Sequence, residues 1–340
     1  MVAVRYPKPL RRGDRIEVPA PSMGVPDTLL ARLQAATDNL RQRGFDPRLR
    51  PHATIGGLTP ASAQERAEDL GAAFAGAGAV LPPWGGELAI ELIEYLDWDA
   101  IADAETWFVG WSDISTLLLP LTILTGVATL HGANLMDEPW ELPTQFKRWT
   151  QVVGLAGGDS FSQSSAPHRR SRAWVDWEDE PLDRKSAYEA PTKWQSLDGR
   201  PVSMQGRLIG GCLETVSLLA GSRFGDVPGF AQRHAPEGLI VYLESAGSDA
   251  PSVLRMLWSL RLAGRFQQAS GIVIGRSSSH DANGLSQVEA LYRAVGDLGI
   301  PVIYDFDIGH QPPQMPLVNG ALADIRLSDG FGMITQHLTT

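Results

Sequence analysis

The sequence has few of the features that cross-link a chain or anchor it in a membrane. Its 340 residues include one cysteine, Cys212, so no internal disulfide can form, and a single thiol provides no metal-binding framework. The most apolar stretch, residues 117–130, is interrupted by Pro120 and Gly126 and is too short to cross a bilayer. The first residues lack the apolar core of a signal peptide. These absences predict a cytoplasmic protein with no membrane partner.

Clusters of positive charge are also scarce. The chain has 29 Lys and Arg against 39 Asp and Glu, a net charge of −10, and its basic clusters are as short as Arg11-Arg12 and His168–Arg170. This pattern argues against nucleic acid or an anionic membrane as a partner. With 43% apolar and 20% charged residues the composition is that of a globular protein, and 340 residues exceed what one core usually supports. We therefore expect two domains.

Predicted strands and helices alternate along the first half of the chain. Strands are expected at 15–22, 45–50, 79–82 and 106–109, and helices at 28–43, 61–74, 87–96 and 114–124. This alternation predicts an α/β fold with a parallel sheet covered on both faces. Ligands of such sheets bind beyond the carboxyl ends of the strands. Gly85, Gly86 and Ser112 fall at that end of their strands and are expected to be neighbours.

The character of the sequence changes near residue 150. Residues 154–200 are rich in Gly, Ser, Pro, Trp and charge and show little periodicity, which favours a functional loop or a crossing between domains. Trp174, Trp177 and Trp194 in this stretch either anchor it to the body of the protein or offer a stacking surface for a flat ligand. Strands and helices alternate again from Arg207 onward. We therefore divide the chain into residues 1–155, a crossing at 156–205, and residues 206–340.

A candidate nucleophile lies in the turn Gly110-Trp-Ser112-Asp113-Ile114. The turn joins a short apolar strand to an apolar helix, a geometry that lifts the hydroxyl of Ser112 clear of the sheet. Backbone N–H groups at the start of the helix then face any negative charge that develops on a substrate. The ordinary alternative is that this serine only caps the helix.

Two further polar residues follow apolar strands in the second half. Glu244 comes after residues 238–243, and His310 lies in a Gly-His-Gln-Pro-Pro turn after residues 301–304. A serine is inert at its own pKa, a histidine can accept its proton near neutrality, and a carboxylate can hold the imidazole in the required tautomer. Each residue also has an ordinary alternative, a capping or ion-paired carboxylate for Glu244 and a hydrogen-bonded loop histidine for His310.

A series of short motifs runs along the chain in a fixed order and resembles the S66 serine peptidase family. That family contains the LD-carboxypeptidases and the microcin C7 self-immunity (MccF-type) hydrolases. The motifs are Pro19–Ser22, Trp84–Gly86, Asp97–Asp99, Phe108–Asp113, Thr129–Gly132, Leu243-Glu244, Leu262–Phe266, Ile274–Arg276, Gly309-His310 and Pro316–Gly320.

The resemblance implies a role for each motif residue. Ser112 would be the nucleophile, His310 the general base and Glu244 its orienting carboxylate. The backbone N–H groups of Gly86 and Asp113 would form the oxyanion hole.

The resemblance also implies the surroundings of this site. Gly85 and His131 would contribute to substrate binding. The implied fold is an N-terminal flavodoxin-like parallel-sheet domain and a C-terminal swivelling β/α domain, with the site between them, commonly in a homodimer. No metal or cofactor is required.

Within the family, residues 207–216 and the tryptophan-bearing loop before them are similar to the MccF-like branch. The resemblance then implies that Trp174 and Trp177 stack on the base of a small peptidyl or aminoacyl-nucleotide substrate and that the enzyme serves toxin self-immunity or detoxification. Two positions depart from the family pattern. Glu91 stands in place of an arginine of the LD-carboxypeptidases, and residues 245–249 lack the basic residue that some MccF relatives carry.

Three alternatives are weighed against this interpretation. The first is a murein-tetrapeptide LD-carboxypeptidase of cell-wall recycling that uses the same residues. The second is a non-catalytic protein that binds a small ligand in the cleft. The third, a class I amidotransferase-like enzyme, is disfavoured because Cys212 lies far along the chain from the nucleophile turn.

Overall fold

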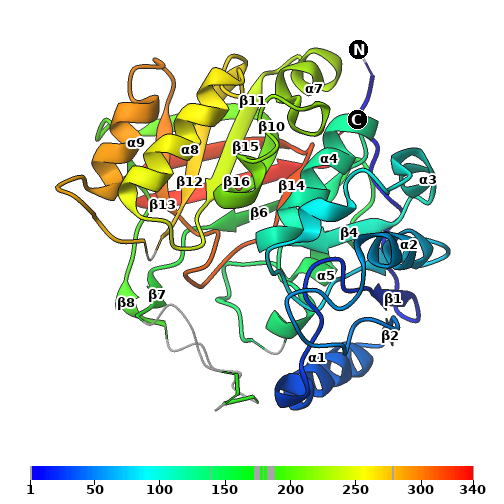
Figure 1. The fold of residues 1–340 in the computed structure, drawn as a ribbon. Helices are drawn as coiled ribbons and strands as arrows, with labels where there is room; N and C mark the ends of the chain where they lie inside the picture. Colours follow the sequence, from blue (N-terminus) through cyan, green and yellow to red (C-terminus); the bar gives the residue numbers. More distant parts are fainter. Residues whose placement is uncertain are drawn as a thin grey trace.

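The computed structural model contains two large sheets that lie side by side (Figure 1). It describes residues 2–138, 140–171, 177–178, 180–181, 188–277 and 279–339. The N-terminal sheet has six strands and the C-terminal sheet has eight, with a separate hairpin of β7 (His168–Arg170) and β8 (Tyr188–Pro191). Among the described residues, no helix is long and apolar enough to cross a membrane.

The N-terminal sheet has the strand order β14-β5-β4-β3-β1-β2. Its first five strands along the chain pair in parallel, and their order 2-1-3-4-5 is that of flavodoxin-like folds, so the predicted fold class is confirmed. The sixth strand, β14, comes from the C-terminal half and pairs antiparallel with β5. The strands are β1 (Arg15–Val18), β2 (Asp46–Leu49), β3 (Ala79–Val80), β4 (Trp107–Gly110), β5 (Thr129–His131) and β14 (Leu317–Asn319).

The helices of this half follow the predicted pattern with one exception. The predicted helix at 87–96 is wrong: that segment forms only a 3-10 turn, η2 (Ala89–Leu92). Its backbone is bonded to other elements, because Arg66 donates to the carbonyl of Leu88 and the Ala89 N–H donates to Asp113. The helical segments are η1 (Asp27–Leu29), α1 (Leu30–Gln42), α2 (Ala63–Ala73), α3 (Trp98–Asp103), η3 (Ser112–Ile114), α4 (Ser115–Thr125), η4 (Leu135–Asp137) and α5 (Trp149–Val152).

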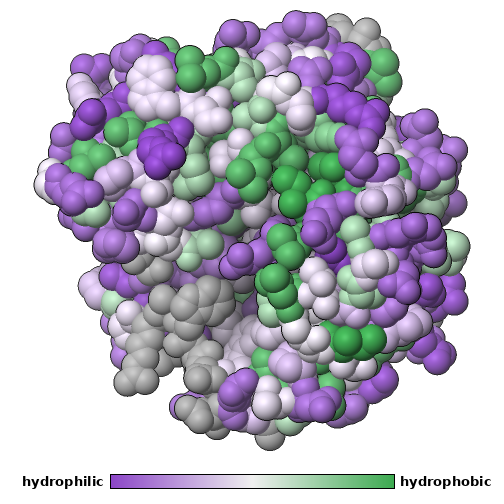
Figure 2. Space-filling view, viewed as in Figure 1, coloured by the Kyte–Doolittle hydropathy of each residue, from purple (hydrophilic) through white to green (hydrophobic). Residues whose placement is uncertain are grey.

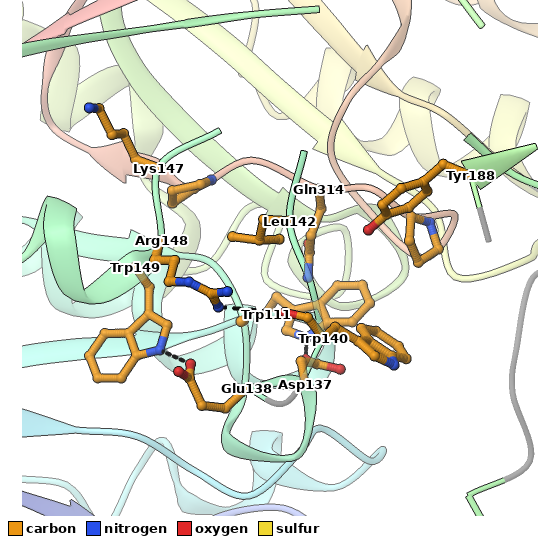
Figure 3. Close-up of a pocket in the computed structure, with 13 residues that line it drawn as sticks. Trp111, Asp137, Glu138, Trp140, Leu142, Lys147, Arg148, Trp149, Tyr188 and Gln314 are labelled. Atoms are coloured by element: carbon orange, nitrogen blue, oxygen red, sulfur yellow. Dashed lines mark hydrogen bonds between the residues drawn. The ribbon is translucent and has the colours of Figure 1, made fainter. Parts of the chain in front are cut away.

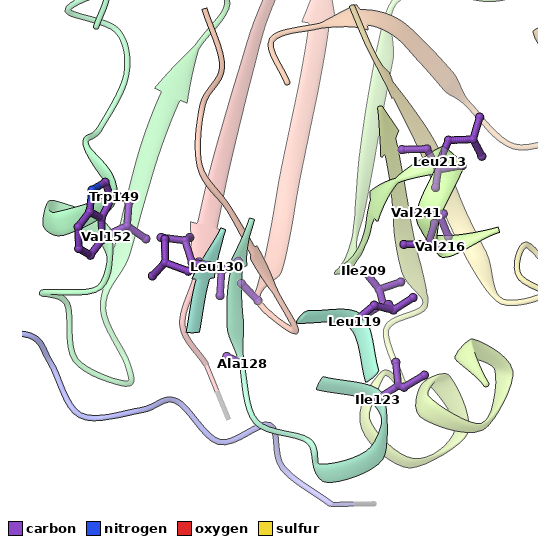
Figure 4. Packing of buried hydrophobic residues seen from close by; sticks show 14 of the residues in the cluster. Leu119, Ile123, Ala128, Leu130, Trp149, Val152, Ile209, Leu213, Val216 and Val241 are labelled. Atoms are coloured by element: carbon purple, nitrogen blue, oxygen red, sulfur yellow. The ribbon is translucent and has the colours of Figure 1, made fainter. Parts of the chain in front are cut away.

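Helix α4 is the wall shared by the two halves. Every residue from Ser115 to Ile123 is buried, as expected of a helix that is apolar on all sides. Leu119 and Ile123 of α4 lie next to Ile209 of the C-terminal half, while other members of the same cluster line the N-terminal sheet (Figure 4). One continuous core therefore fixes the helix that follows Ser112 against both sheets.

The C-terminal sheet has the strand order β6-β16-β15-β10-β11-β12-β13-β9. The four adjacent strands β10 to β13 are parallel, and helices α8 and α9 cover one face of them (Figure 1). The elements of this half are β6 (Ser160–Ser164), β9 (Gln195–Ser196), β10 (Val202–Cys212), α6 (Leu213–Val216), η5 (Arg223–Gly225), α7 (Val227–His234), β11 (Leu239–Glu244), α8 (Ala250–Leu262), β12 (Ala269–Gly275), α9 (Gln287–Val295), β13 (Val302–Phe306), β15 (Leu322–Ser328) and β16 (Phe331–His337).

The stretch 154–200 contains more packed structure than its composition predicts. Strands β6 and β9 lie in it and form the two edges of the C-terminal sheet. Trp194 is 1% exposed, donates to Asp307 and stacks on Phe306. At these residues the chain forms packed structure and not the functional loop or inter-domain crossing that the composition favours, because edge strands this short leave almost no alternation for the sequence to show.

Candidate active site

The turn that carries Ser112 is built by the junction of β4 and η3. Ser112 has a φ of 59°, the left-handed region that costs a non-glycine residue about 1–2 kcal/mol. The backbone N–H of Trp111 donates to the side chain of Asn134 at 3.2 Å, and the indole Nε1 donates to Asp137 at 2.8 Å. These bonds fix the residue before Ser112, so the strained turn is held by the loop after β5.

Ser112, His310 and Glu244 come together in one hydrogen-bonded row. His310 Nε2 lies 3.1 Å from Ser112 Oγ, and His310 Nδ1 lies 2.7 Å from Glu244 Oε2. Because a carboxylate only accepts, Nδ1 carries the proton in that bond, and Nε2 of the neutral ring is left to accept from the serine. His310 and Glu244 are 3% and 1% exposed. The arrangement has the geometry required to take a proton from a serine hydroxyl.

The charged groups around His310 favour the protonated imidazole more than water does. Burial acts to lower the pKa of His310, but the nearby Glu244 carboxylate and its hydrogen bond outweigh burial and raise the pKa above its ordinary value. The carboxylates of Glu214 and Asp137 act in the same direction. An imidazolium formed during proton transfer is therefore stabilised at this position.

The loop that carries His310 is held by a buried ion pair. Arg276 Nη1 lies 2.6 Å from Asp307 Oδ1, and both side chains are almost fully buried. Arg276 also donates to the carbonyls of Gln311 and Pro313 on the other side of the histidine. Arg276 belongs to the motif Ile274–Arg276 but has no role predicted from sequence, and its contacts show that it fixes this loop.

Gly85 and Gly86 lie against the serine. A Cβ atom on Gly85 would be 2.9 Å from Ser112 Oγ and 3.2 Å from the backbone nitrogen of Asp113. Gly86 has a φ of +144°, and a Cβ there would overlap with Ser22 Oγ. Any side chain here would therefore fill the space beside the nucleophile or strain the loop.

The side chain of Asp113 holds the glycine loop in place. Its Oδ2 accepts from Ser22 Oγ at 2.6 Å and from the Ala89 N–H at 2.8 Å. Only the backbone of Asp113 has a role predicted from sequence, and Ser22 has none. The sequence does contain one indication that Ser22 lies near Ser112. Ser22 stands at the end of the first predicted strand, and neighbouring parallel strands end at the same edge of a sheet.

His131 is placed behind the row rather than on a surface. Its side chain is fully buried, its ring lies 5.4 Å from that of Tyr242, and neither ring nitrogen has a hydrogen-bond partner among the described residues. Burial lowers the pKa of His131 to about 4, so it is neutral at pH 7. This placement does not fit the expected contact with substrate.

Trp177 packs among other side chains, whereas Trp174 lies outside the described residues. The Trp177 ring stacks on Trp84 with centroids 6.3 Å apart and lies 5.5 Å from that of Trp140. Arg32 lies over the Trp177 ring at 4.9 Å. These contacts fit the anchoring interpretation of Trp177, and they connect the loop to the residue that precedes Gly85.

A pocket with aromatic walls, which we call the aromatic pocket, is drawn with its lining residues in Figure 3. It adjoins the site directly, since Trp111 precedes Ser112 and packs on His310 with ring centroids 4.4 Å apart. Its lining residues are Trp111, Ala133, Asp137, Glu138, Trp140, Leu142, Lys147, Arg148, Trp149, Tyr188, Pro312, Gln314 and Pro316. Because they come from five separate stretches, no local sequence pattern could have revealed the pocket.

A strained serine and a glycine loop at the carboxyl ends of one parallel sheet, with a buried histidine and carboxylate brought from the second sheet, define a hydrolase of the serine-peptidase type. Residues 16–132 match the LD-carboxypeptidase N-terminal domain and residues 205–325 match the LD-carboxypeptidase C-terminal domain. The chain therefore belongs to the S66 family of serine peptidases and is an enzyme of that kind.

Several relatives cover most of the chain. It is 28% identical over 326 residues to a Vibrio cholerae protein whose name places it among the carboxypeptidases, with 91% of each chain covered. It is 25% identical to the microcin C7 self-immunity protein MccF of Escherichia coli, covering 75% of this chain and 73% of that protein. It is 26% identical to the murein tetrapeptide carboxypeptidase of Pseudomonas aeruginosa, covering 87% and 88%.

The fold is also similar to that of solved MccF structures. The structure of MccF in complex with aspartyl sulfamoyl adenosine matches with a TM-score of 0.82 at 20% identity and covers 99% of this chain and 100% of that one. At this identity the likeness concerns the fold. It confirms the predicted two-part α/β architecture along the whole chain.

Proposed function

We propose that the chain is a serine hydrolase that cleaves an amide bond through a serine ester. Ser112 Oγ attacks the carbonyl carbon as His310 Nε2 takes its proton, and Glu244 stabilises the imidazolium. The backbone N–H groups of Gly86 and Asp113 donate to the oxyanion. His310 then protonates the leaving nitrogen, and water hydrolyses the ester by the same route in reverse. Removing one oxyanion donor or one of the three side chains typically lowers kcat by about two to six orders of magnitude.

The observation that carries this proposal is the row of contacts from Ser112 to Glu244. Its distances of 3.1 and 2.7 Å lie within hydrogen-bonding range, and the direction of each bond is set by the carboxylate at its end. Gly85 leaves open the space beside the hydroxyl that a carbonyl would occupy. No residue of the row needs to move for proton transfer.

We propose further that the substrate is a small aminoacyl- or peptidyl-nucleotide-like molecule, as in an MccF-like role in self-immunity or detoxification. The aromatic pocket supports this choice, because its tryptophan walls suit a flat base and Lys147 and Arg148 suit a negatively charged linker. In this proposal the base lies near Trp111 and Trp140, and Trp177 supports Trp140 from behind through its ring contact. The MccF structure with aspartyl sulfamoyl adenosine has the same overall fold.

A second candidate is cleavage of a murein tetrapeptide, as in the relative from Pseudomonas aeruginosa. The aromatic pocket provides less for this substrate, which has no flat ring. At Glu91, where LD-carboxypeptidases carry an arginine, the structure places a carboxylate that pairs with Arg66. This position therefore offers no positive charge of its own to a free substrate carboxylate.

The test is to supply alanyl sulfamoyl adenosine and a tetrapeptide ending in D-alanine, each in turn, to the pure protein and to its Ser112→Ala variant. We expect wild type to release alanine from the nucleoside compound and the variant to lose this activity while keeping its circular dichroism spectrum. Cleavage of the tetrapeptide alone would favour the second candidate. Binding without any hydrolysis by wild type would support a non-catalytic binding protein.

The remaining expectations from the sequence are proposals of the same kind. They are a homodimer in solution, a cytoplasmic location, and domain limits at residues 155 and 205. Analytical ultracentrifugation tests the first, cell fractionation the second and limited proteolysis the third.

A further inference from the structure

Glu214 is a carboxylate beside the candidate active site that the proposed mechanism does not use. It belongs to the short helix α6, which follows β10 directly. Strand β10 runs parallel to β11, and Cys212 at its end is the register partner of Glu244. The sheet therefore brings Glu214 to the same edge as the acid of the row.

Contacts through Cys212 show how close this carboxylate lies. The Cys212 thiol donates to Glu214 Oε2 at 3.3 Å. The same sulfur and the polar atoms of Glu244 and His310 lie within 4.8 Å of one another. Glu214 also acts on the protonation of His310, as described above. Among the described residues, only the Cys212 side chain therefore links Glu214 to the row, on the side formed by β10 and β11.

The two oxygens of Glu214 have different surroundings. Oε1 accepts from Ser245 Oγ at 2.6 Å, Ser248 Oγ at 2.8 Å and the Ala246 N–H at 3.0 Å, which fixes the turn after Glu244. Burial acts to raise the pKa of Glu214, but these hydrogen bonds outweigh it and keep the pKa below its ordinary value. The group is therefore ionised at neutral pH.

Oε2, by contrast, receives only the weak thiol donor of Cys212 in the hydrogen bonds described. Within the described part of the chain, no Lys, Arg or His forms an ion pair with Glu214. A fixed and half-buried carboxylate with free lone pairs attracts a cation and repels another carboxylate. The aromatic pocket contains none of these residues and carries Lys147 and Arg148 instead.

We propose that Glu214 sets the specificity for the acyl part of the substrate, so that a cationic aminoacyl side chain is preferred to an acidic one. This inference rests on the proposed function, because it assigns the flat leaving group to the aromatic pocket and the acyl group to the β10–β11 side. At an effective dielectric constant near 20, two charges about 6 Å apart interact strongly enough to change a rate about 100-fold. We therefore expect a lysyl over aspartyl preference of at least about tenfold.

The experiment compares lysyl, alanyl and aspartyl sulfamoyl adenosine on wild type and on Glu214→Gln. The measured quantity is the ratio of kcat/KM for the lysyl and aspartyl compounds, because a general loss of activity cancels in it. We expect the ratio to fall close to one in the variant, with the neutral alanyl compound affected least. The glutamine keeps an oxygen for Ser245 and Ser248, so the turn retains its acceptor.

Two control variants separate charge from structure. Ser248→Ala loosens the same turn without changing any charge, and Glu94→Gln removes an equal charge from an exposed position. Both are expected to keep the wild-type ratio. A ratio near one in wild type, or an unchanged ratio in Glu214→Gln, would overturn the inference while leaving the hydrolase proposal intact.

Binding distinguishes the other outcomes. Calorimetry on Ser112→Ala measures the Kd of the lysyl and aspartyl compounds without turnover. A lysyl preference that disappears in the Ser112→Ala, Glu214→Gln double variant supports the inference even if wild type hydrolyses neither compound, in which case only the proposed function fails. If neither compound binds or reacts, both proposals are wrong.

Discussion

Replacing Glu244 by glutamine tests the acid of the row with a nearly unchanged shape. The glutamine can still accept from His310 Nδ1, but it carries no charge to stabilise the imidazolium. Two unit charges about 4 Å apart interact by about 4 kcal/mol at an effective dielectric constant of 20. The equivalent change in the well-studied Ser-His-Asp triad lowers kcat about 10⁴-fold. We therefore expect a loss of about 10³- to 10⁴-fold in kcat.

Stability should not follow activity in this variant. Glu244 is 1% exposed, and its Oε1 has no hydrogen-bond partner among the described residues. Removing a buried charge whose bonds are incomplete relieves a desolvation cost, so the free energy of unfolding at pH 8 should be equal to or higher than that of wild type.

The assay is the initial rate on alanyl sulfamoyl adenosine together with urea unfolding followed by tryptophan fluorescence. The control is Glu94→Gln, in which an exposed carboxylate changes in the same way. A loss of less than tenfold in kcat, or a loss that is matched by marked destabilisation, would refute the reasoning.

Three further changes test other parts of the structure. Gly85→Ala should lower kcat at least about 100-fold because the added methyl group meets Ser112. The control is Gly71→Ala in α2, where a methyl group meets nothing within 4 Å and full activity is expected. Initial rates of the two variants test this. The general base must be neutral, and the pKa of His310 is raised, so kcat/KM should fall as the pH drops, with a midpoint above 6.5. The measurement is a pH profile of kcat/KM from 5 to 9. A midpoint below 6.5 would contradict the assignment of His310 as the base. Ser62→Ala removes the cap of α2, where Ser62 Oγ accepts from the Glu65 N–H, and should cost about 1 kcal/mol in urea unfolding with unchanged kcat.

The parts of the site that depend on local chain geometry could be predicted from sequence. A glycine, a serine and an acid between an apolar strand and an apolar helix predict the turn at Ser112, and Glu244 and His310 are each predicted to follow an apolar strand. Each of the three residues also has an ordinary alternative, and the family resemblance supplied their proposed roles. The structure places all these residues together.

Features that depend on distant contacts could not be predicted in this way. The segment after Gly86 has a helical pattern, but Arg66 and Asp113 take its backbone groups. The ring of Trp177 is occupied by Trp84 and Trp140, which lie far from it in sequence. Glu214 has no unusual sequence neighbours, and its importance follows only from the register of two strands.

The segment 307–316, which carries His310, is tied to both sheets. At one end Asp307 is paired with Arg276 beside β12, and at the other β14 is hydrogen-bonded to β5 of the opposite sheet. A change in the spacing of the sheets therefore moves the imidazole relative to the serine before any strand separates. Heating should consequently abolish turnover several degrees below the temperature at which the cores melt, and a small ligand that bridges the two halves should narrow that interval.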